Sequence, residues 1–422
     1  MNAVTGLFKQ VLLPPPCIIQ GHQPDAGTTD PVDIQSDPSL LPPGSDDRVD
    51  GTMITDKGGA WMTFDNRRIS GRGKVFEGTT ILVVVTCLTL FSFSFSAAQT
   101  DRAEKHQTFF VYFENDSFGG TDRHYTNAFR LSWLSPDLTE YDEDTRLPRW
   151  GLPIIRKLPL INRPGFQRNV GLSVGQNIYT PEDISRRDFI KDDRPYAGWS
   201  YFSLTFHVKN AVQMDVFEVT MGIVGPSSLA KDTQRIVHRW LENENPKGWD
   251  NQLRNEPGLL ISWQRNWRLF STGNGKGLGF DFIPHIGGAV GNVATFANIG
   301  GEMRIGYNLP FDFGTSFIRS GSGIEAPADM TDPRLRRRKN FGFHLFADVD
   351  GRAVARNIFL DGNTWKDSHS VDQKRLVADM AAGFAVVYKR LKLSYAHVYR
   401  TKEFDGQEKG EVFGSITLAI TF

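Results

Sequence analysis

A period of two governs this sequence from Phe109 to its last residue. The stretch 198–208 is typical, because its apolar side chains occupy every second position, at Phe202, Leu204, Phe206 and Val208. Such alternation is what a strand with one buried face requires. Roughly twelve segments follow this pattern, and many are about ten residues long, the length that a tilted strand needs to cross a bilayer. The pattern therefore predicts an all-β fold, a transmembrane antiparallel β-barrel of about twelve strands.

Soluble β-sandwiches alternate in the same way, so other features must separate the two folds. Aromatic side chains gather near segment ends, as in the girdles of membrane barrels, and these are Trp133, Trp199, Tyr201, Trp263, Trp267, Tyr395 and Tyr399. The chain also stops at Phe422, behind alternating apolar residues, which resembles the terminal strand that the barrel-assembly machinery recognises. A closed barrel is the arrangement in which strands satisfy their backbone groups in lipid. These features favour a membrane barrel.

Composition excludes several other classes. Lys and Arg number 48 and Asp and Glu number 48, so the net charge of zero argues against nucleic acid as a partner bound through bulk charge. A hydrophobic content of 40% does not supply the several apolar runs of a helical membrane protein. The 2 cysteines, Cys17 and Cys87, cannot form a disulfide framework or a zinc–thiolate site.

The first quarter of the chain differs from the rest. Residues 1–61 are rich in Pro, Asp, Gly and Ser, which indicates a disordered extension or a start assigned too far upstream. Residues 62–98 have the layout of a signal peptide, with basic residues before the apolar run 81–95 and small residues up to Ala98. An uncleaved anchor helix is the alternative for that run. Cleavage near Ala98 would leave residues 99–422 as a barrel domain in the bacterial outer membrane.

One segment interrupts the alternation and predicts a short helix. It spans residues 232–242, follows Gly225-Pro226, and could be capped by Ser227, Ser228 or Asp232. Apolar residues that include Ile236 and Val237 give this helix an apolar side, which would leave His238 near the polar boundary. A helix between barrel strands belongs at the rim or in the lumen, where it can contribute to a site.

The densest polar cluster spans residues 109–133. A predicted strand ends in Asn115 and Asp116, a glycine-rich turn follows, and the chain returns through Thr126. Asn and Asp at a strand end are most often turn formers. Asn115, Asp116 and Thr126 also offer oxygen ligands, which suit a hard cation such as calcium. The cluster is therefore either an ordinary turn or part of a metal site.

Three stretches together resemble the outer-membrane lipid A 3′-O-deacylase family, and the resemblance runs from about Phe109 to Phe422. They are ENDSFGGTDRHYTNAFRLSW, QNIYTPEDISRRDFIKDDRPYAGW and GIVGPSSLAKDTQRIVHRWLENENPKGWDNQL. The resemblance implies a twelve-stranded barrel with its active site among lumen-facing side chains near the outer leaflet. It also implies calcium-dependent ester hydrolysis, which removes the 3′-linked acyloxyacyl chain from the lipid A of lipopolysaccharide. The partners implied are lipopolysaccharide as substrate and the surrounding outer-membrane lipids.

The resemblance also implies which residues carry the reaction. The family's catalytic histidine, which lies on the helix, falls on His238. A neutral imidazole can take a proton from water near pH 7, so His238 would be the general base. Glu244, or a neighbour, would fix the tautomer of that imidazole. Asn115, with the basic pair Arg186 and Arg187, would stabilise the oxyanion.

The metal ligands come from the same motifs. Calcium would be held by Asp116, Thr126 and Glu244 and would polarise the ester carbonyl; the hydroxyl of Thr126 also counts among the catalytic groups. The family has Lys at the position of Arg186, so this residue is a departure. Arg keeps the charge, but its planar fork does not replace an ammonium group.

Other functions remain open at the level of sequence. An outer-membrane phospholipase or another esterase could use the same calcium–histidine machinery. A non-catalytic, porin-like barrel would need an open lumen and would leave His238 as an ordinary helix-surface histidine. The basic run 334–339 could bind lipid A phosphates through its arginines, or it could form a solvated loop.

Overall fold

The structure is a computed structural model that describes residues 106–116, 124–138, 165–241, 245–272, 276–319, 323–336 and 341–422. The predicted extension 1–61 and signal peptide 62–98 lie outside the described residues. Within these ranges, no helix is both long enough and apolar enough to cross a bilayer.

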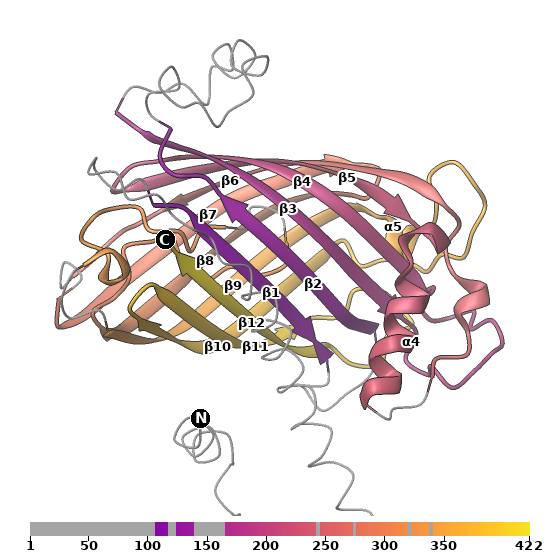
Figure 1. Cartoon of the computed structure of the whole chain (residues 1–422). Coiled ribbons are helices and arrows are strands. Elements are labelled where there is room, and N and C mark those ends of the chain that lie inside the picture. The colour runs from indigo at the N-terminus through magenta and orange to yellow at the C-terminus, as the bar shows by residue number, and fades with distance from the viewer. Residues whose placement is uncertain are drawn as a thin grey trace, which may run out of the picture. The chain divides into compact units, whose positions relative to one another are not determined.

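The described strands form one closed antiparallel barrel, in which each strand pairs with its neighbours in sequence and the last strand pairs with the first (Figure 1). They are β1 (Thr108–Asn115), β2 (His124–Leu134), β3 (Gln167–Thr180), β4 (Ala197–Lys209), β5 (Gln213–Val224), β6 (Glu256–Trp267), β7 (Leu278–Gly291), β8 (Ala294–Tyr307), β9 (Phe341–Asn357), β10 (Leu376–Tyr388), β11 (Leu391–Arg400) and β12 (Glu411–Thr421). The predicted fold class is confirmed.

Strand β9 shows why this barrel suits a membrane. Phe343, Leu345 and Val349 are exposed on the outside, whereas His344 and Asp348 between them are buried in the lumen. Apolar residues outside and polar residues inside are the pattern of a transmembrane barrel. Since the same alternation recurs around the wall, as in β6, the outer surface can be solvated by lipid.

Two residues of the predicted aromatic girdle do not lie on the outer surface of the barrel. Trp199 and Tyr201 are buried and line a lumenal cavity of about 150 Å³, with their ring centroids 4.5 Å apart. They share the parity of Ser203 along β4, and Ser203 is buried in the lumen. The period of two therefore turns these rings inward. Tyr399, by contrast, is 41% exposed on the outside.

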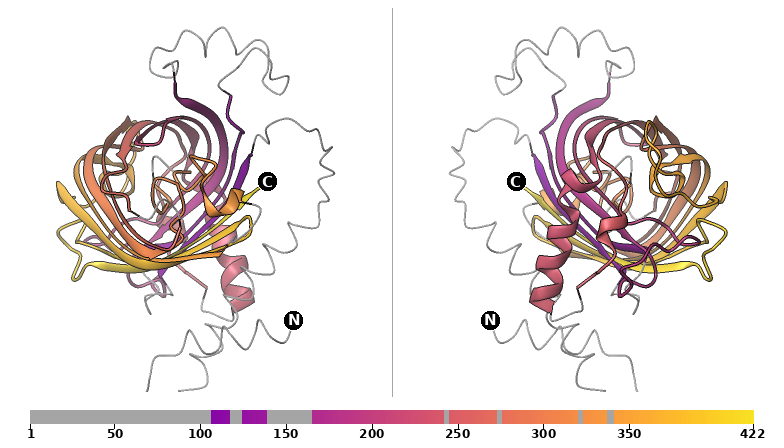
Figure 2. Two further views of the ribbon diagram at one scale, coloured as in Figure 1. Left: turned by 90° about the vertical axis from the view of Figure 1, so that its left-hand side faces the viewer. Right: turned by 90° about the vertical axis from the view of Figure 1, so that its right-hand side faces the viewer.

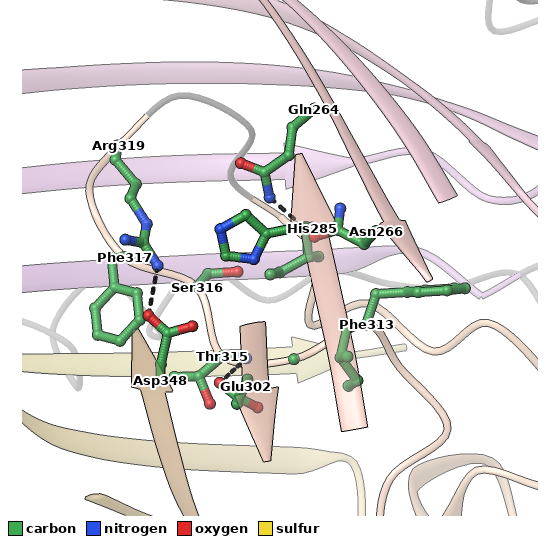
Figure 3. A pocket seen from close by; sticks show the side chains of 13 residues that line it. Gln264, Asn266, His285, Glu302, Phe313, Thr315, Ser316, Phe317, Arg319 and Asp348 are labelled. Carbon is green, nitrogen blue, oxygen red and sulfur yellow. Dashed lines mark hydrogen bonds and ion pairs between the residues drawn. The ribbon is translucent and has the colours of Figure 1, made fainter. Parts of the chain in front are cut away.

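The connection between β8 and β9 folds back into the lumen and includes the short helix η6 (Pro333–Leu335) (Figure 2, left). The backbone N–H of Ile318 donates to Glu114 Oε1 at 2.8 Å, and that of Thr315 donates to Glu302 Oε2 at 2.9 Å. Figure 3 shows this segment against side chains of the wall. The cavity that remains there is about 20 Å³, about enough for one water molecule.

Buried ion pairs hold this connection in place. Asp312 lies 3.0 Å from Lys392 Nζ, 3.0 Å from Arg334 Nη2 and 2.5 Å from Arg304 Nη1. Burial alone would raise the pKa of Asp312, but these three cations outweigh it and hold the pKa well below its usual range. Arg334, the first residue of the basic run 334–339, is thus a buried structural residue and not part of a phosphate-binding loop.

The two ends of the barrel differ in their connections. One end carries the start of β1, the end of β12 and the β8–β9 connection; we call it the termini end. The opposite end, the loop end, carries the β1–β2, β3–β4 and β5–β6 connections. The β5–β6 connection contains η3 (Pro226–Ser228), α4 (Ala230–Leu241) and η4 (Trp249–Asn251), and α5 (Ile358–Asp361) follows β9. All the segments that supply predicted site residues therefore meet at the loop end.

Candidate active site

Helix α4 is the predicted histidine-bearing helix, and it begins at Ala230, two residues before the predicted start. Gly225 and Leu229 have positive φ angles, of 96° and 61°, which reverse the chain before the first turn. Ser228, one of the three predicted caps, places its Oγ 3.4 Å from the N–H of Ala230. The side-chain oxygen thus lies near one of the N–H groups that a helix start leaves without an intrahelical partner.

The buried face of α4 is polar. Ala230, Gln234 and His238 follow each other at intervals of four, and 1%, 2% and 4% of their surfaces are exposed. This spacing places them on one side of the helix. The prediction that His238 lies at a polar boundary is wrong. Ile236 is 47% exposed, and the buried side of the helix is the one that carries His238.

Several contacts fix α4 to the outside of the barrel wall (Figure 2, right). The carbonyl oxygen of Ser228 accepts hydrogen bonds from Gln176 Nε2 at 2.7 Å and from Ser200 Oγ at 2.6 Å. Ala230 packs with Ile178 of β3 in a small apolar cluster. A Cβ atom at Gly198 of β4 would lie only 2.1 Å from the Cβ of Ala230, so the close approach requires a glycine there.

Asn115 lies on the same outer face of the wall. Its neighbour Glu114 points into the lumen, where it accepts from Ile318 N–H, and successive strand residues point to opposite faces. Strand register places Asn115 opposite Asn127, and Asn127 opposite Ile178. Directly paired residues share a face, so this row lies on the side of the wall that α4 covers.

The dimensions of helix and sheet are compatible with a site between them. Register extends the row from Ile178 to Gly198, three interstrand spacings or about 14 Å from Asn115. Ala230 lies against Gly198, and His238 is about 12 Å further along the helix axis. Figure 1 shows α4 extending from the ends of β4 and β3 toward those of β2 and β1. The expectation of a lumen-facing site is therefore wrong, because Asn115 and the α4 helix belong to the outer face.

The remaining predicted residues of the polar cluster lie beside this row. Asp116 directly follows β1 and is fully buried. Thr126 lies between His124 and Asn127, where the pairing of β2 with β3 shifts register; such bulges often accompany active sites. The side chains of Thr126 and Glu244 lie outside the described part of the structure, so their predicted roles stay predictions.

The oxygen donors present fit calcium in their chemistry. Asn115 and Asp116 offer an amide oxygen and a carboxylate, and their exposed fractions are 8% and 0%. Calcium prefers such ligands, and a buried carboxylate is usually paired or bound to a metal. Among the described residues, no three His, Cys, Asp or Glu side chains are grouped as a metal site.

Arg186 and Arg187 are exposed in the β3–β4 connection, next to the segment that follows α4. The N–H of Lys247 donates to the carbonyl of Ile184 at 2.9 Å, and Asn251 Nδ2 donates to the carbonyl of Arg187 at 2.9 Å. The two connections therefore lie side by side. The structure brings Arg187 near α4, while both guanidinium groups remain outside the wall.

Gln234 is a candidate site residue that the sequence reasoning missed. It lies one turn before His238 on the buried face, and its Oε1 accepts from Trp249 Nε1 at 2.8 Å. The i to i+4 spacing from Gln234 to His238 is visible in the sequence. Apolar positions ordinarily predict the buried side of a helix, and in α4 they predict the wrong side.

Fold and site together define a class of protein: a membrane β-barrel with a candidate polar site on the outside of its wall, beneath a helix from one of its loops. Comparison with protein families then gives the particular family. The model of outer membrane protein LpxR matches residues 82–422, so the chain belongs to this family of bacterial outer-membrane proteins. A comparison with curated proteins gives no significant match.

Solved structures support the same fold. The chain is similar to LpxR from Salmonella typhimurium, with 16% sequence identity and a TM-score of 0.58, over 75% of this chain and 100% of that one. The β domain of the Bordetella autotransporter BrkA is more distant, with 8% identity and a TM-score of 0.36 over 75% of this chain and 98% of that one. The first likeness shows a shared barrel.

Proposed function

We propose that this protein is an outer-membrane hydrolase that removes the 3′-linked acyloxyacyl chain of lipid A by ester hydrolysis. Membership of the LpxR family supports a role in lipid A modification. The observation that carries the proposal is the position of His238, which is buried on the wall-facing side of α4. A site on the outer face can receive a lipid directly from the bilayer.

The orientation of the barrel fits this substrate. Outer-membrane barrels keep both chain termini on the periplasmic side, and this feature sets the orientation here; loop length does not, because the long β8–β9 connection lies at the termini end. By that rule the loop end, with α4, lies at the outer leaflet, where lipid A resides. The ester of a lipid in that leaflet would then lie at the level of the row that ends in Asn115.

The reaction follows from the chemistry of the side chains. His238 takes a proton from the attacking water as the water oxygen bonds to the ester carbon. It returns this proton to the sugar oxygen as the bond between that oxygen and the acyl carbon breaks. General acid–base catalysis of this kind typically contributes about 10²–10⁴-fold. Asn115 donates its amide N–H to the oxyanion, and Arg186 or Arg187 adds positive charge there. Glu244 is the proposed partner that fixes the imidazole tautomer.

Calcium is the proposed cofactor, held by Asp116, Thr126 and Glu244. When bound, it polarises the ester carbonyl. The protein residues bind and orient the ester around it. The departure at Arg186 changes the shape of the cationic group in that position, since a guanidinium donates in a plane.

Two alternative functions make different demands on the structure. A porin-like barrel needs a continuous lumen, yet the described part of the β8–β9 connection packs inside the lumen, where the cavities beside it are about 20 Å³ and 150 Å³. An outer-membrane phospholipase would use the same groups, so substrate assays must separate it from a lipid A hydrolase.

The proposal is tested by expressing the chain from Met62 onward in an outer-membrane host and taking mass spectra of the extracted lipid A. We expect lipid A that has lost one acyloxyacyl chain with the wild type and intact lipid A with His238→Ala. A calcium chelator should abolish the change, and added calcium should restore it. Intact lipid A in the wild type, with a folded barrel in the membrane, would exclude this activity and direct the assays to phospholipids.

A further inference from the structure

A basic groove lies at the loop end, beside the candidate site. It has a volume of about 390 Å³ and is lined by Arg187, Lys231, Arg235, Asn245, Pro246, Lys247 and Asp250. We call these residues the basic groove. Its volume falls in the range of small-molecule pockets, about 300–1,000 Å³. Three segments form it: the β3–β4 connection, α4 and the segment that carries η4.

The groove has an excess of positive charge. Lys231 Nζ lies 2.9 Å from Asp250 Oδ1, which accounts for one of its cations. The hydrogen bond from Lys231, together with the charges of Lys231, Arg187 and Arg235, lowers the pKa of Asp250. Among the described residues, Arg187, Arg235 and Lys247 have no carboxylate within salt-bridge distance. Three exposed cations around one paired carboxylate favour an anion.

The position of the groove on α4 links it to His238. Lys231 and Arg235 each follow a residue of the buried face, Ala230 and Gln234, by one position. Each residue along an α-helix is rotated by about 100° around the helix axis relative to the one before it. The basic stripe therefore flanks the stripe that carries His238.

Ile236 lies on the far side of the same helix. It is 47% exposed, and its spacing of two positions from both Gln234 and His238 places it about 160° from the buried stripe. The basic residues Lys231 and Arg235 are therefore closer to the histidine stripe than this exposed apolar residue is.

We propose that the basic groove binds a phosphate group on the head group of the lipid substrate, so that Arg235 and Lys247 set the orientation in which the ester reaches His238. Arginine suits this role because its guanidinium can donate two parallel hydrogen bonds to a phosphate. The proposal rests on the proposed lipid hydrolase function and specifies how its substrate is positioned. Arg235 and Lys247 are positioning residues, since they contact the head group and not the reacting ester.

The test compares the double variant Arg235→Ala/Lys247→Ala with the wild type on two lipids, lipid A with both phosphates and lipid A from which both have been removed. For the phosphorylated lipid we expect the variant to raise KM about tenfold, the loss of two exposed charge pairs, with kcat unchanged. For the dephosphorylated lipid, KM should be equal in both proteins. Lys402→Ala, an exposed lysine in the β11–β12 connection, is the matched control and should change neither constant.

Two results would overturn the groove assignment. One is an equal KM of the wild type for both lipids; the other is a fall in kcat of the double variant on both. Inorganic phosphate in millimolar excess should leave the preference for phosphorylated lipid intact; if it removes that preference, the ligand is free phosphate and not the lipid.

Binding separates this inference from the proposed reaction. Purified His238→Ala protein on a sensor surface should retain phosphorylated lipid A more strongly than dephosphorylated lipid A, and adding Arg235→Ala/Lys247→Ala should remove the difference. If the wild type hydrolyses neither lipid but this binding difference is present, the reaction is wrong and the groove stands. If hydrolysis occurs and binding ignores the phosphates, the groove is wrong and the reaction stands.

Discussion

The two faces of the barrel wall contrast in what their polar groups do. On the lumen side, Arg130 pairs with Glu218 at 2.9 Å, and Asp312 is surrounded by three cations. On the outer side, Asn115 and His238 lie between strand ends and a helix. The charged groups on the lumen side fill the lumen, and their charges are paired. The polar groups on the outer side lie where a lipid can approach, so the contrast separates a structural region from a chemical one.

The two histidines of these regions provide the largest expected difference. His238→Ala should lower kcat by about 10²–10⁴-fold, because it removes the proposed general base. His285→Ala is the matched control, since His285 Nε2 contacts Asp350 Oδ2 at 2.8 Å inside the lumen. It should lower barrel stability and leave kcat of the folded protein unchanged. Initial rates of acyl release from lipid A micelles give kcat for the two variants. Equal losses of kcat in His238→Ala and His285→Ala would contradict the separation of a structural region from a chemical one.

A pair of asparagines gives a smaller expected effect. Asn115→Ala should lower kcat by about 10²–10³-fold, the usual loss for one oxyanion donor, about 2.7–4 kcal/mol. Asn177 lines the lumenal cavity on the other face, so Asn177→Ala should stay within a factor of about two, as remote polar substitutions do. The same rate assay applies. A loss at Asn177 that matches the loss at Asn115 would move the reaction into the lumen.

The packing of α4 against the wall should be sensitive to one added methyl group. Gly198→Ala places a Cβ 2.1 Å from that of Ala230, which must push the helix outward. A displacement of about 1 Å typically costs about 10²-fold in rate, with little change in barrel stability. Gly351→Ala is the control, since its Cβ would meet only a carbonyl oxygen, 3.7 Å away. A fully active Gly198→Ala protein would mean that α4 does not position the base.

The lumenal charges should affect stability and not the reaction. Asp312→Ala leaves Lys392, Arg334 and Arg304 buried without their shared carboxylate, and breaking such a network costs about 3–5 kcal/mol of unfolding free energy. Denaturant titration of the barrel in lipid vesicles measures the loss. The rate per folded molecule should remain at the wild-type value; a tenfold decrease would show that the lumen takes part in the chemistry.

The barrel could be predicted from the sequence because its governing signal is local. Alternation in segments such as β9 needs no information about distant residues, and lipid outside with polar groups inside preserves it along the strand. The predicted cap Ser228 was likewise a local feature. These parts of the fold follow from periodicity and turn chemistry.

The face that carries the site could not be predicted, because the local signal fails where a loop covers the wall. Ile178 and Asn115 are both buried although they point outward, so burial no longer marks the lumen. For α4 the rule reversed: Ile236 is exposed and Gln234 is buried. A helix at a membrane surface can turn apolar residues outward, and its sequence alone does not say which side the wall takes.

The claim that lipid A binds on the outer face of the wall, beneath α4, can be measured by photo-crosslinking in the outer membrane. Asn127 and Asn177 are the matched positions, one in the outward row with Asn115 and the other lining the lumenal cavity. Each is replaced in turn by p-benzoylphenylalanine in the His238→Ala background, and captured lipid A is detected after irradiation. We predict capture at position 127 and none at position 177. Capture at position 177 alone would contradict an outer-face site and return the reaction to the lumen.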